Sequence, residues 1–529
     1  MNPSALSFEV ESRDQGLQAL GRVAETCPAR VQSHPERRSA YLDTFDWRIY
    51  RNGGSLLSSR EGRATVLRWK SLDGTPHHRL RVTEPPAFVW DLPASPLKTA
   101  LEPLVEMRRL MTRLVLVFPS DTLEVLDVNQ KIVARIRLEA ATAIAPGSAT
   151  PEATLPILLT ADPVRGYDKQ FRSLLSLLKR LPGLRPTASS QFDSALRLLG
   201  IEPSSSDHKL RIRLTPDIPS EAAARRIHAR LLETIRLNEG GVREDLDTEF
   251  LHDFRVAVRR TRSALTQIKG VYPQDVTERF KPEFAWLGQV TGPKRDLDVY
   301  LLKMPEYRAS LPEHIQEHLE PLQEYLSRHQ GLEHRRLVQA LDSERYVRLL
   351  QEWQEFLTDS NGRGSPDHAV APQAEVPIGR TASTRIWKAY RKVLKRGRSI
   401  GEDSPAEPLH RLRIDCKKLR YLLEFFRSLY DEQEIGSLVK ALKRLQDNLG
   451  DFNDLEIQQA SLRRFADDMF QEGLATGDTL MAMGRLVDRL EAKQTEERQK
   501  FEREFAKFAS KKNRARFRAL FADQSTAAS

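Results

Sequence analysis

The sequence predicts a multidomain protein: an N-terminal α+β domain built on an antiparallel β-sheet or β-barrel, followed by an all-α domain of duplicated four-helix bundles. Three observations predict this class. Short runs of alternating apolar and polar residues fill the N-terminal part of the chain, apolar residues recur every three or four positions in the rest, and one motif occurs twice. A length of 529 residues also suits more than one domain.

Residues 1–203 form the predicted α+β domain. Segments such as "ATVLRWKS" and "RLVLVFPS" alternate apolar and polar residues, which is typical of strands with one buried face. A helix is expected over residues 167–181, and "FDSALRLLG" predicts a short helix that ends at Gly200. The polar stretch "IEPSSSDHK" then predicts a linker.

Residues 207–529 form the predicted helical domain, which we interpret as an internal duplication. His252 and His410 are 158 positions apart, and the same offset relates Gly292 to Gly450. A segment near 359–380, rich in Gly, Pro and Ser, predicts a loop between the two copies, which we place at 215–358 and 380–529. Because facing apolar stripes bury one another, each copy is expected to form a bundle of about four helices.

Each copy carries a stripe of cations beside its apolar helix face. On a helix, "LHDFRVAVRRTRSAL" and "LHRLRIDCKKLRYLL" each place one His and three cations along one edge of that face. These residues are His252, Arg255, Arg259 and Arg262 in the first copy, and His410, Arg413, Lys417 and Arg420 in the second. Neither stripe contains an acid, although opposite charges at i, i+4 would stabilise a helix. The pattern favours an anion-binding surface over a plain solvated face.

A second helix of the second copy repeats the spacing. The segment "RIWKAYRKVLKRGR" places four cations on one stripe: Lys388, Arg391, Lys395 and Arg398. The matching helix of the first copy offers Arg226, Arg230 and Arg236, but Glu233 interrupts them. A further basic helix is expected in the second copy at Lys440, Lys443 and Arg444. The second copy is therefore predicted to be the more basic of the two.

The expected ligand is a linear polyanion. The net charge of +10 favours an anionic partner, and Arg and Lys side chains spaced at helical pitch suit a row of phosphates. No motif for reading DNA sequence occurs, and aromatic residues, which stack on RNA bases, make up only 7% of the chain. A phosphate polymer without bases fits best, and non-specific nucleic-acid binding through the same cations is the alternative.

With both motif blocks in view, the helical domain resembles the CHAD family, which is named for conserved histidines in an α-helical domain. The resemblance implies two four-helix bundles related by pseudo-twofold symmetry, and binding of inorganic polyphosphate through basic residues. Carried over, that role falls on the two stripes at His252–Arg262 and His410–Arg420, with the Lys388–Arg398 row as an extension. The resemblance also implies association with polyphosphate granules in a bacterial-type cytosol.

The N-terminal domain resembles the CYTH, or triphosphate tunnel, family in outline. The residues that carry this resemblance are Glu9, Glu11, Arg13, Asp43, Thr44, Arg60 and Lys70. The late strand "ARIRLEA" supplies Glu139 alone, where the family has paired metal-binding acids. Metal-assisted hydrolysis needs clustered carboxylates. We therefore expect a degenerate domain without catalysis, and a metal-dependent triphosphatase or polyphosphatase is the alternative.

The remaining features predict no metal and no cofactor. His252 and His410 have no second His or Cys at ligand spacing. The acids of Asp296-Leu-Asp298 and Asp454-Leu-Glu456 are expected to cap helices or to pair with stripe cations rather than to hold magnesium. Two cysteines, no signal peptide and no membrane-spanning run predict a cytoplasmic protein without a membrane partner. Oligomeric state is not predicted.

Overall fold

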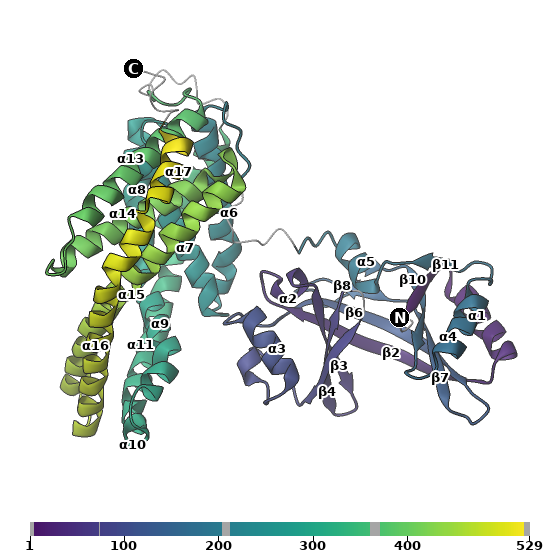
Figure 1. Cartoon of the computed structure of the whole chain (residues 1–529). Helices are drawn as coiled ribbons and strands as arrows, with labels where there is room; N and C mark the ends of the chain where they lie inside the picture. Colours follow the sequence, from purple (N-terminus) through teal and green to yellow (C-terminus); the bar gives the residue numbers. More distant parts are fainter. Residues whose placement is uncertain (1–4, 73–74, 204–211, 360–370, 523–529) are drawn as a thin grey trace. The chain divides into compact units, whose positions relative to one another are not determined.

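The computed structural model describes residues 5–72, 75–203, 212–359 and 371–522 (Figure 1). The chain divides into two compact units, Met1–His208 and Lys209–Ser529. Most of the predicted linker, and the central part of the predicted loop between the two copies, lie outside the described residues. None of the described helices is long and apolar enough to cross a lipid bilayer.

The first unit is an antiparallel sheet with helices beside it, as the sequence predicts. Its strands are β1 (Leu6–Val10), β2 (Ala29–Asp43), β3 (Gly54–Glu61), β4 (Ala64–Ser71), β5 (Pro76–Val82), β6 (Met111–Leu126), β7 (Ile132–Glu139), β8 (Thr142–Ile144), β9 (Ala153–Thr154), β10 (Ile157–Pro163) and β11 (Arg185–Thr187). Its helices are α1 (Arg13–Thr26), α2 (Arg48–Arg51), η1 (Val89–Asp91), α3 (Pro96–Val105), α4 (Asp168–Leu178) and α5 (Gln191–Leu198).

The strands pair in the order β11-β1-β10-β7-β6-β2-β3-β4-β5, and β8 and β9 branch from β6. Within the described residues this path has two ends, so the sheet is open and is not a closed barrel. Alternation along the strands separates its two faces. Phe8, Ile136 and Leu159 are buried in the same core as Phe171 of α4. Their strand neighbours, such as Glu9 and Arg137, therefore point to the other face.

The second unit is all-α and repeats itself element by element. The first copy contains α6 (Ser220–Arg243), α7 (Thr248–Gln267), α8 (Gln274–Val290), α9 (Gly292–Ala309), α10 (Glu313–Gln316), η2 (Glu317–Leu319), α11 (Glu320–Leu341) and α12 (Glu344–Thr358). The second contains α13 (Ile378–Arg398), α14 (Ala406–Phe425), η4 (Arg427–Leu429), α15 (Glu432–Gln471), α16 (Gly477–Phe508) and α17 (Lys511–Phe521). Helices α6, α7 and α8 each begin 158 residues before α13, α14 and α15. The offset read from the two histidines thus holds for whole helices.

The two copies differ where α8 gives way to α9. Helix α15 is continuous over 40 residues, whereas its counterpart is interrupted at Thr291, between α8 and α9. Pro293 follows this interruption, and Asp451 occupies the matching position of α15. Proline has no backbone N–H and clashes with the preceding turn, so it disrupts a helix that aspartate leaves continuous.

Four long helices from both copies share one core. Leu297 of α9 and Leu322 of α11 belong to the same apolar cluster as Leu462 of α15 and Leu486 of α16. Figure 1 shows these four helices running along one another. One bundle of the unit is therefore built jointly by the two copies, because each hairpin alone would leave an apolar stripe exposed.

A pseudo-twofold axis passes between the starts of α6 and α13. Pro219 and Pro377, which are equivalent positions, form an antiparallel backbone bridge. The N–H of Ser220 donates to the carbonyl of Val376, and the N–H of Ile378 donates to the carbonyl of Ile218, both at 2.9 Å. The two donors, Ser220 and Ile378, are 158 residues apart, and so are the two acceptors, Ile218 and Val376. Each bond is thus the equivalent of the other. Such reciprocal pairing is what a twofold relation between two similar halves produces.

A buried ion cluster fixes the start of α9. Nζ of Lys294 lies 2.6 Å from Oδ1 of Asp245 and 2.7 Å from Oδ1 of Asp298. The side chains of Lys294 and Asp298 are almost wholly buried. The matching position in the second copy is Phe452, which is also buried. The same helical position thus tolerates an apolar side chain where no buried acid needs a partner.

We expect Lys294→Met to lower the free energy of unfolding of the helical unit by about 3 kcal/mol or more, because removing one partner leaves the carboxylate of Asp298 buried and unpaired. Chemical denaturation followed by circular dichroism measures this loss. The double variant Lys294→Met, Asp298→Leu is expected to recover most of the stability. A double variant no more stable than Lys294→Met would contradict this explanation.

Candidate polyanion-binding site

Helices α7 and α14 carry the two predicted cation stripes, and they pack against each other. Their apolar faces are buried as predicted; Leu251, Phe254, Leu412 and Cys416 are at most 2% exposed. The stripes meet where the helices cross, because the charge of Arg259 on α7 acts directly on Lys417 of α14. These two residues occupy equivalent positions in the duplication. The structure therefore brings a cation from each copy to the pseudo-twofold axis.

We name the eight stripe residues the axial cluster: His252, Arg255, Arg259, Arg262, His410, Arg413, Lys417 and Arg420. Lys417 lies at its centre. Burial, together with the charges of Arg413 and Arg259, lowers the pKa of Lys417 to about 8, and Asp454 opposes them. Burial is the largest cause, and the charges of Arg413 and Arg259 each act on Lys417 more strongly than the opposing charge of Asp454.

In the first copy, the backbone of the α8–α9 junction holds Arg255 in place. Nη1 of Arg255 donates to the carbonyl of Gly288 and to Oγ1 of Thr291, each at 2.9 Å. Burial lowers the pKa of Arg255; Arg259 and Arg295 act in the same direction, and Asp296 opposes them. These neutral partners orient the guanidinium without neutralising it.

Two cations of the same stripe reach solvent. Arg259 and Arg262 are exposed, and neither guanidinium group forms an ion pair or hydrogen bond with any residue in the described ranges. Arg262 lies beside Gly288, where a Cβ would meet Nη1 of Arg262 at 3.5 Å. Both guanidinium groups are available to an anion.

In the second copy, acids offset part of the charge. Nη2 of Arg413 donates to Oδ1 of Asp454 at 2.9 Å, and Nε of Arg420 donates to Oε1 of Glu424 at 2.8 Å. Asp454 thus pairs with a stripe cation, as the sequence predicts. Lys417 has no such pair among the described residues. The axial cluster is therefore partly neutralised at its edge and cationic at its centre.

The two histidines have different neighbours. Nδ1 of His410 lies 2.6 Å from Oδ1 of Asn453, and Nε2 lies 2.9 Å from Oε2 of Glu456. In the first copy, Nη2 of Arg295 lies 3.2 Å from Nδ1 of His252, and Arg295 and Asn453 are equivalent positions. Asp298, the counterpart of Glu456, forms an ion pair with Lys294. Since arginine is always a donor, it favours a neutral acceptor nitrogen on His252.

Arg295 belongs to the site, although the stripe pattern did not identify it. Its Nη1 donates to the carbonyl of Thr248 at 3.1 Å, and its charge acts on Arg255. Helical spacing along α7 cannot reveal a residue contributed by α9. The available signal was the Lys294-Arg295 pair inside a block that the duplication had already marked.

The row Lys388, Arg391, Lys395 and Arg398 is not brought together with the axial cluster. Helix α13 meets α14 through Lys392, 2.9 Å from Asp415, and through Arg396, which also pairs with Asp415. Asp415 lies two positions from both Arg413 and Lys417, or about 200° around α14. Helix α14 thus stands between the row and the axial cluster.

The other basic helices differ as the sequence predicts. On α6, Nη1 of Arg230 pairs with Glu233 at 2.6 Å, so this helix offers fewer available cations. On α15, Lys440, Lys443 and Arg444 are exposed. Lys443 precedes Gln446 by about one turn, and Gln446 accepts from Arg420 at 3.4 Å. The second copy therefore presents the more extensive basic surface.

Most candidate residues of the N-terminal unit have structural partners. Glu11 pairs with Arg185 at 2.5 Å and Arg13 with Asp121 at 2.8 Å, while Glu9 and Arg60 are exposed. Asp43 is buried and accepts the backbone N–H groups of three residues: Thr44, Ile49 and Tyr50. Burial raises the pKa of Asp43 to about 6. Its contacts secure the turn into α2.

Lys70 and Glu139 belong to a mixed cluster on the polar face of the sheet. Arg137 donates to Glu139 at 3.0 Å and to Asp162 at 2.8 Å. Burial lowers the pKa of Lys70, and Arg137 acts in the same direction. Across the described ranges, no three His, Cys, Asp or Glu side chains are grouped so as to hold a metal ion. Glu139 and Asp162 on this face both pair with Arg137.

Known proteins match parts of this chain. Residues 226–463 match the CHAD domain family. An uncharacterized protein of Mycobacterium tuberculosis is 26% identical over 280 residues, which cover 52% of this chain and 53% of that protein. The chain thus spans about half the length of the curated relatives it matches.

Two solved structures resemble the chain. The CHAD domain of the plant Ricinus communis is 27% identical, with a TM-score of 0.48, over 57% of this chain and 96% of that one. A putative adenylyl cyclase from Hippeastrum with a dominant triphosphatase activity, which the N-terminal sheet unit resembles, is 12% identical, with a TM-score of 0.27, over 37% of this chain and 95% of that one. Residues 226–463, which include α7, α14 and the axial cluster, form a CHAD domain.

Proposed function

We propose that the protein binds inorganic polyphosphate at the axial cluster and acts as a binding protein rather than an enzyme. The observation that carries the proposal is the meeting of Arg259 and Lys417 at the pseudo-twofold axis. These two like charges repel each other, and the described residues supply no acid that neutralises either one fully. A bound polyanion would turn this repulsion into attraction.

The arrangement of charges suits a chain of phosphates. Arg295 and Arg259 both act electrostatically on Arg255. Arg259, Arg413 and Arg420 act in the same way on Lys417, so the cations form one connected group. Each stripe extends over ten residues of helix, or about 15 Å. A line of this length exceeds a single phosphate. Guanidinium groups bind phosphate oxygens through two parallel hydrogen bonds, which adds geometric selectivity.

The aromatic side chains on the two stripe helices favour a polymer without bases. Phe250 and Phe254 of α7 and Tyr421 and Phe425 of α14 are at most 6% exposed. Single-stranded nucleic acids are usually held by stacking of bases on exposed aromatic rings. Neither helix offers such a ring. The CHAD domain supports the same ligand, and association with polyphosphate granules would follow from it.

For the full-length chain, we expect long-chain polyphosphate to bind tightly, with an affinity that falls as salt rises because counterions are released. The variant Arg259→Gln, Lys417→Gln should bind at least about tenfold more weakly, because each charge-assisted hydrogen bond contributes about 1.5–3 kcal/mol. Its log affinity should also fall less steeply with log salt, by about one unit for each cation removed. Fluorescence anisotropy at several salt concentrations measures both quantities.

The matched control is Arg485→Gln, Arg489→Gln, which removes two exposed arginines from α16 and makes the same change in net charge. It should bind as the wild type does. Equal weakening by both variants would show that net charge alone matters and would contradict a site at the axis. Competition by duplex DNA at equal phosphate concentration distinguishes a nucleic-acid partner, and we expect DNA to compete poorly.

Binding should weaken as pH rises through about 8, where Lys417 loses its charge. The bound anion favours the charged amine, so complex formation near this pH should take up a proton. The variant Lys417→Arg stays charged throughout and should lose this part of the pH dependence. Affinity measured from pH 7 to pH 9.5 for both proteins checks the sign. Identical pH profiles would contradict the assignment of this titration to Lys417.

We propose that the N-terminal unit does not hydrolyse phosphate chains, because Glu11, Glu139 and Asp162 are each paired with an arginine. Incubating the full-length protein with triphosphate or polyphosphate, in the presence of magnesium or manganese, should therefore release no phosphate above background. Release that is abolished by Glu9→Ala plus Glu11→Ala would instead establish a metal-dependent triphosphatase.

A further inference from the structure

We infer that the row Lys388, Arg391, Lys395 and Arg398 is a second, separate polyphosphate-binding surface, so that one protein molecule holds two chains and cross-links them. The inference rests on the proposed function of the axial cluster and extends it from binding to assembly. We name these four residues the α13 row.

The packing of α13 turns the row toward solvent. Ile386, Tyr390, Val393 and Gly397 are buried and form the core edge of the helix. Tyr390 stacks on Phe517 of α17, with ring centroids 3.7 Å apart. A Cβ on Gly397 would overlap the ring of Phe505, so α13 and α16 are in close contact there. With these contacts made, the row occupies the opposite side of the helix, and all four of its side chains are exposed.

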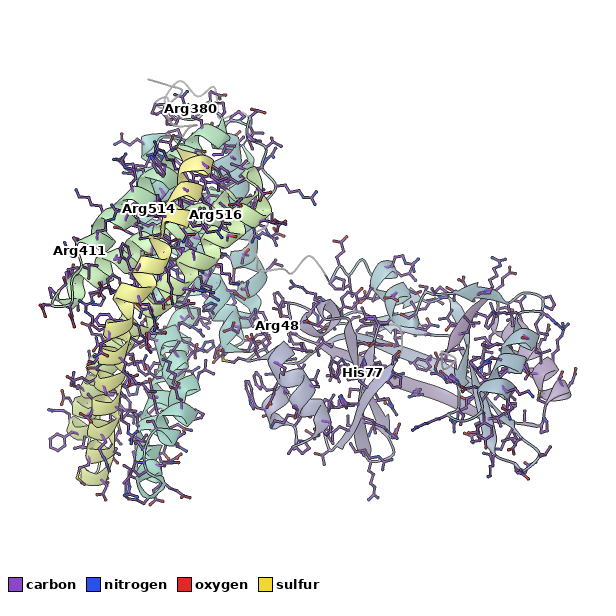
Figure 2. The ribbon with its side chains drawn as sticks, in the orientation of Figure 1. Arg48, His77, Arg380, Arg411, Arg514 and Arg516 are labelled. Carbon is purple, nitrogen blue, oxygen red and sulfur yellow. The ribbon has the colours of Figure 1, made fainter. Side chains whose placement is uncertain are left out.

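The charges of the row are not neutralised. None of its four cations forms an ion pair or hydrogen bond with a residue in the described ranges. A groove of about 450 Å³ runs along the helix and is lined by Arg391, Leu394, Lys395, Arg398 and Ser399, with no acid among them. Arg514 of α17, labelled in Figure 2, is exposed, and its charge and that of Arg398 both act on Tyr390. A second helix thus adds to the positive field.

The acid between α13 and α14, Asp415, already has cationic partners on α13. Asp415 is buried at the seam of α13 and α14, where it pairs with both Lys392 and Arg396. Two cations on one carboxylate leave the seam with a net positive charge. Arg411, also labelled in Figure 2, is exposed on the α14 side of the seam and pairs with Glu407. The seam therefore does not compete with an anion for the row.

The row and the axial cluster are too far apart around the helices for one short chain. Asp415 faces α13, whereas Arg413 and Lys417 lie about 200° away on α14. A helix with its side chains is about 10–12 Å across, and the row itself is about 15 Å long. A polyphosphate that covers one surface therefore ends before it reaches the other. Short chains should fill the two surfaces independently.

Two surfaces on one molecule have a consequence that a single surface lacks. A protein with one site decorates a long chain, and each added molecule leaves the complex soluble. A protein with two sites joins chains to one another, and each chain engages many proteins, so a network grows. Excess polymer should then dissolve the network, because each site can bind a separate chain and chains are no longer shared between protein molecules.

The test uses the full-length protein and two polyphosphate preparations, a short one just long enough to span one row and a long one. Isothermal titration calorimetry should show two short chains bound per wild-type molecule and one per molecule of Arg391→Gln, Lys395→Gln. With the long chain, light scattering by the wild type should rise to a maximum and fall again in excess polymer. The row variant should lose this maximum while it still binds through the axial cluster.

The control for net charge is again Arg485→Gln, Arg489→Gln, which should keep both the second short chain and the scattering maximum. A row variant that still binds two short chains, or that scatters as the wild type does, would overturn the inference. One short chain per wild-type molecule, lost in Arg259→Gln, Lys417→Gln, would overturn only the second surface. No binding by the wild type would overturn the proposed function as well.

Discussion

The interaction on which the site depends is the electrostatic repulsion between Arg259 and Lys417, two equivalent cations that the packing of α7 on α14 brings to the pseudo-twofold axis. A residue near a twofold axis necessarily lies beside its counterpart, so a cationic position in the repeated motif places two like charges side by side. The burial of Leu251, Phe254, Leu412 and Cys416 holds α7 and α14 in this crossing. The apolar core of the unit thus maintains an arrangement that electrostatics alone would oppose.

Around this centre the two copies have diverged in ways that change the local charge. In the first copy, Lys294 pairs with Asp298. In the second copy, Phe452 stands at the position of this lysine, and Glu456 lies beside His410. Arg295 adds a cation where the second copy has the neutral Asn453. The first copy therefore contributes the more exposed cations at the axis, and the second contributes the basic helices α13 and α15. A bound polyanion would therefore contact differently charged surfaces on the two copies, although their helices are related by pseudo-twofold symmetry.

The sequence predicts the fold of the helical unit well, because helical periodicity is a local property and the constant offset of 158 residues between the two copies is visible in the sequence itself. The stripe residues follow from the same periodicity. Arg295 could not be predicted from it, since its contact with His252 joins α7 to α9. The position of the α13 row also had to come from the structure, because only the pairing of Lys392 and Arg396 with Asp415 shows which edge of α13 meets α14.

In the N-terminal unit, alternation predicts strands but cannot decide whether a sheet closes, since closure depends on pairing between distant strands. The acids chosen there by resemblance are Glu9, Glu11, Asp43 and Glu139. Asp43 turns out to accept three backbone N–H groups, and Glu11 and Glu139 pair with arginines. These partners are set by the tertiary structure, so residue type and local spacing do not predict them.

The central claim, that a polyanion occupies the axis, is tested most directly by the chemical reactivity of Lys417. An amine-reactive reagent, with mass spectrometry to follow each lysine, would be applied to the full-length protein with and without saturating polyphosphate. We expect polyphosphate to protect Lys417 and to leave the labelling of Lys169, an exposed lysine of the N-terminal unit, unchanged. Equal labelling of Lys417 in the presence and absence of bound polyphosphate would contradict it.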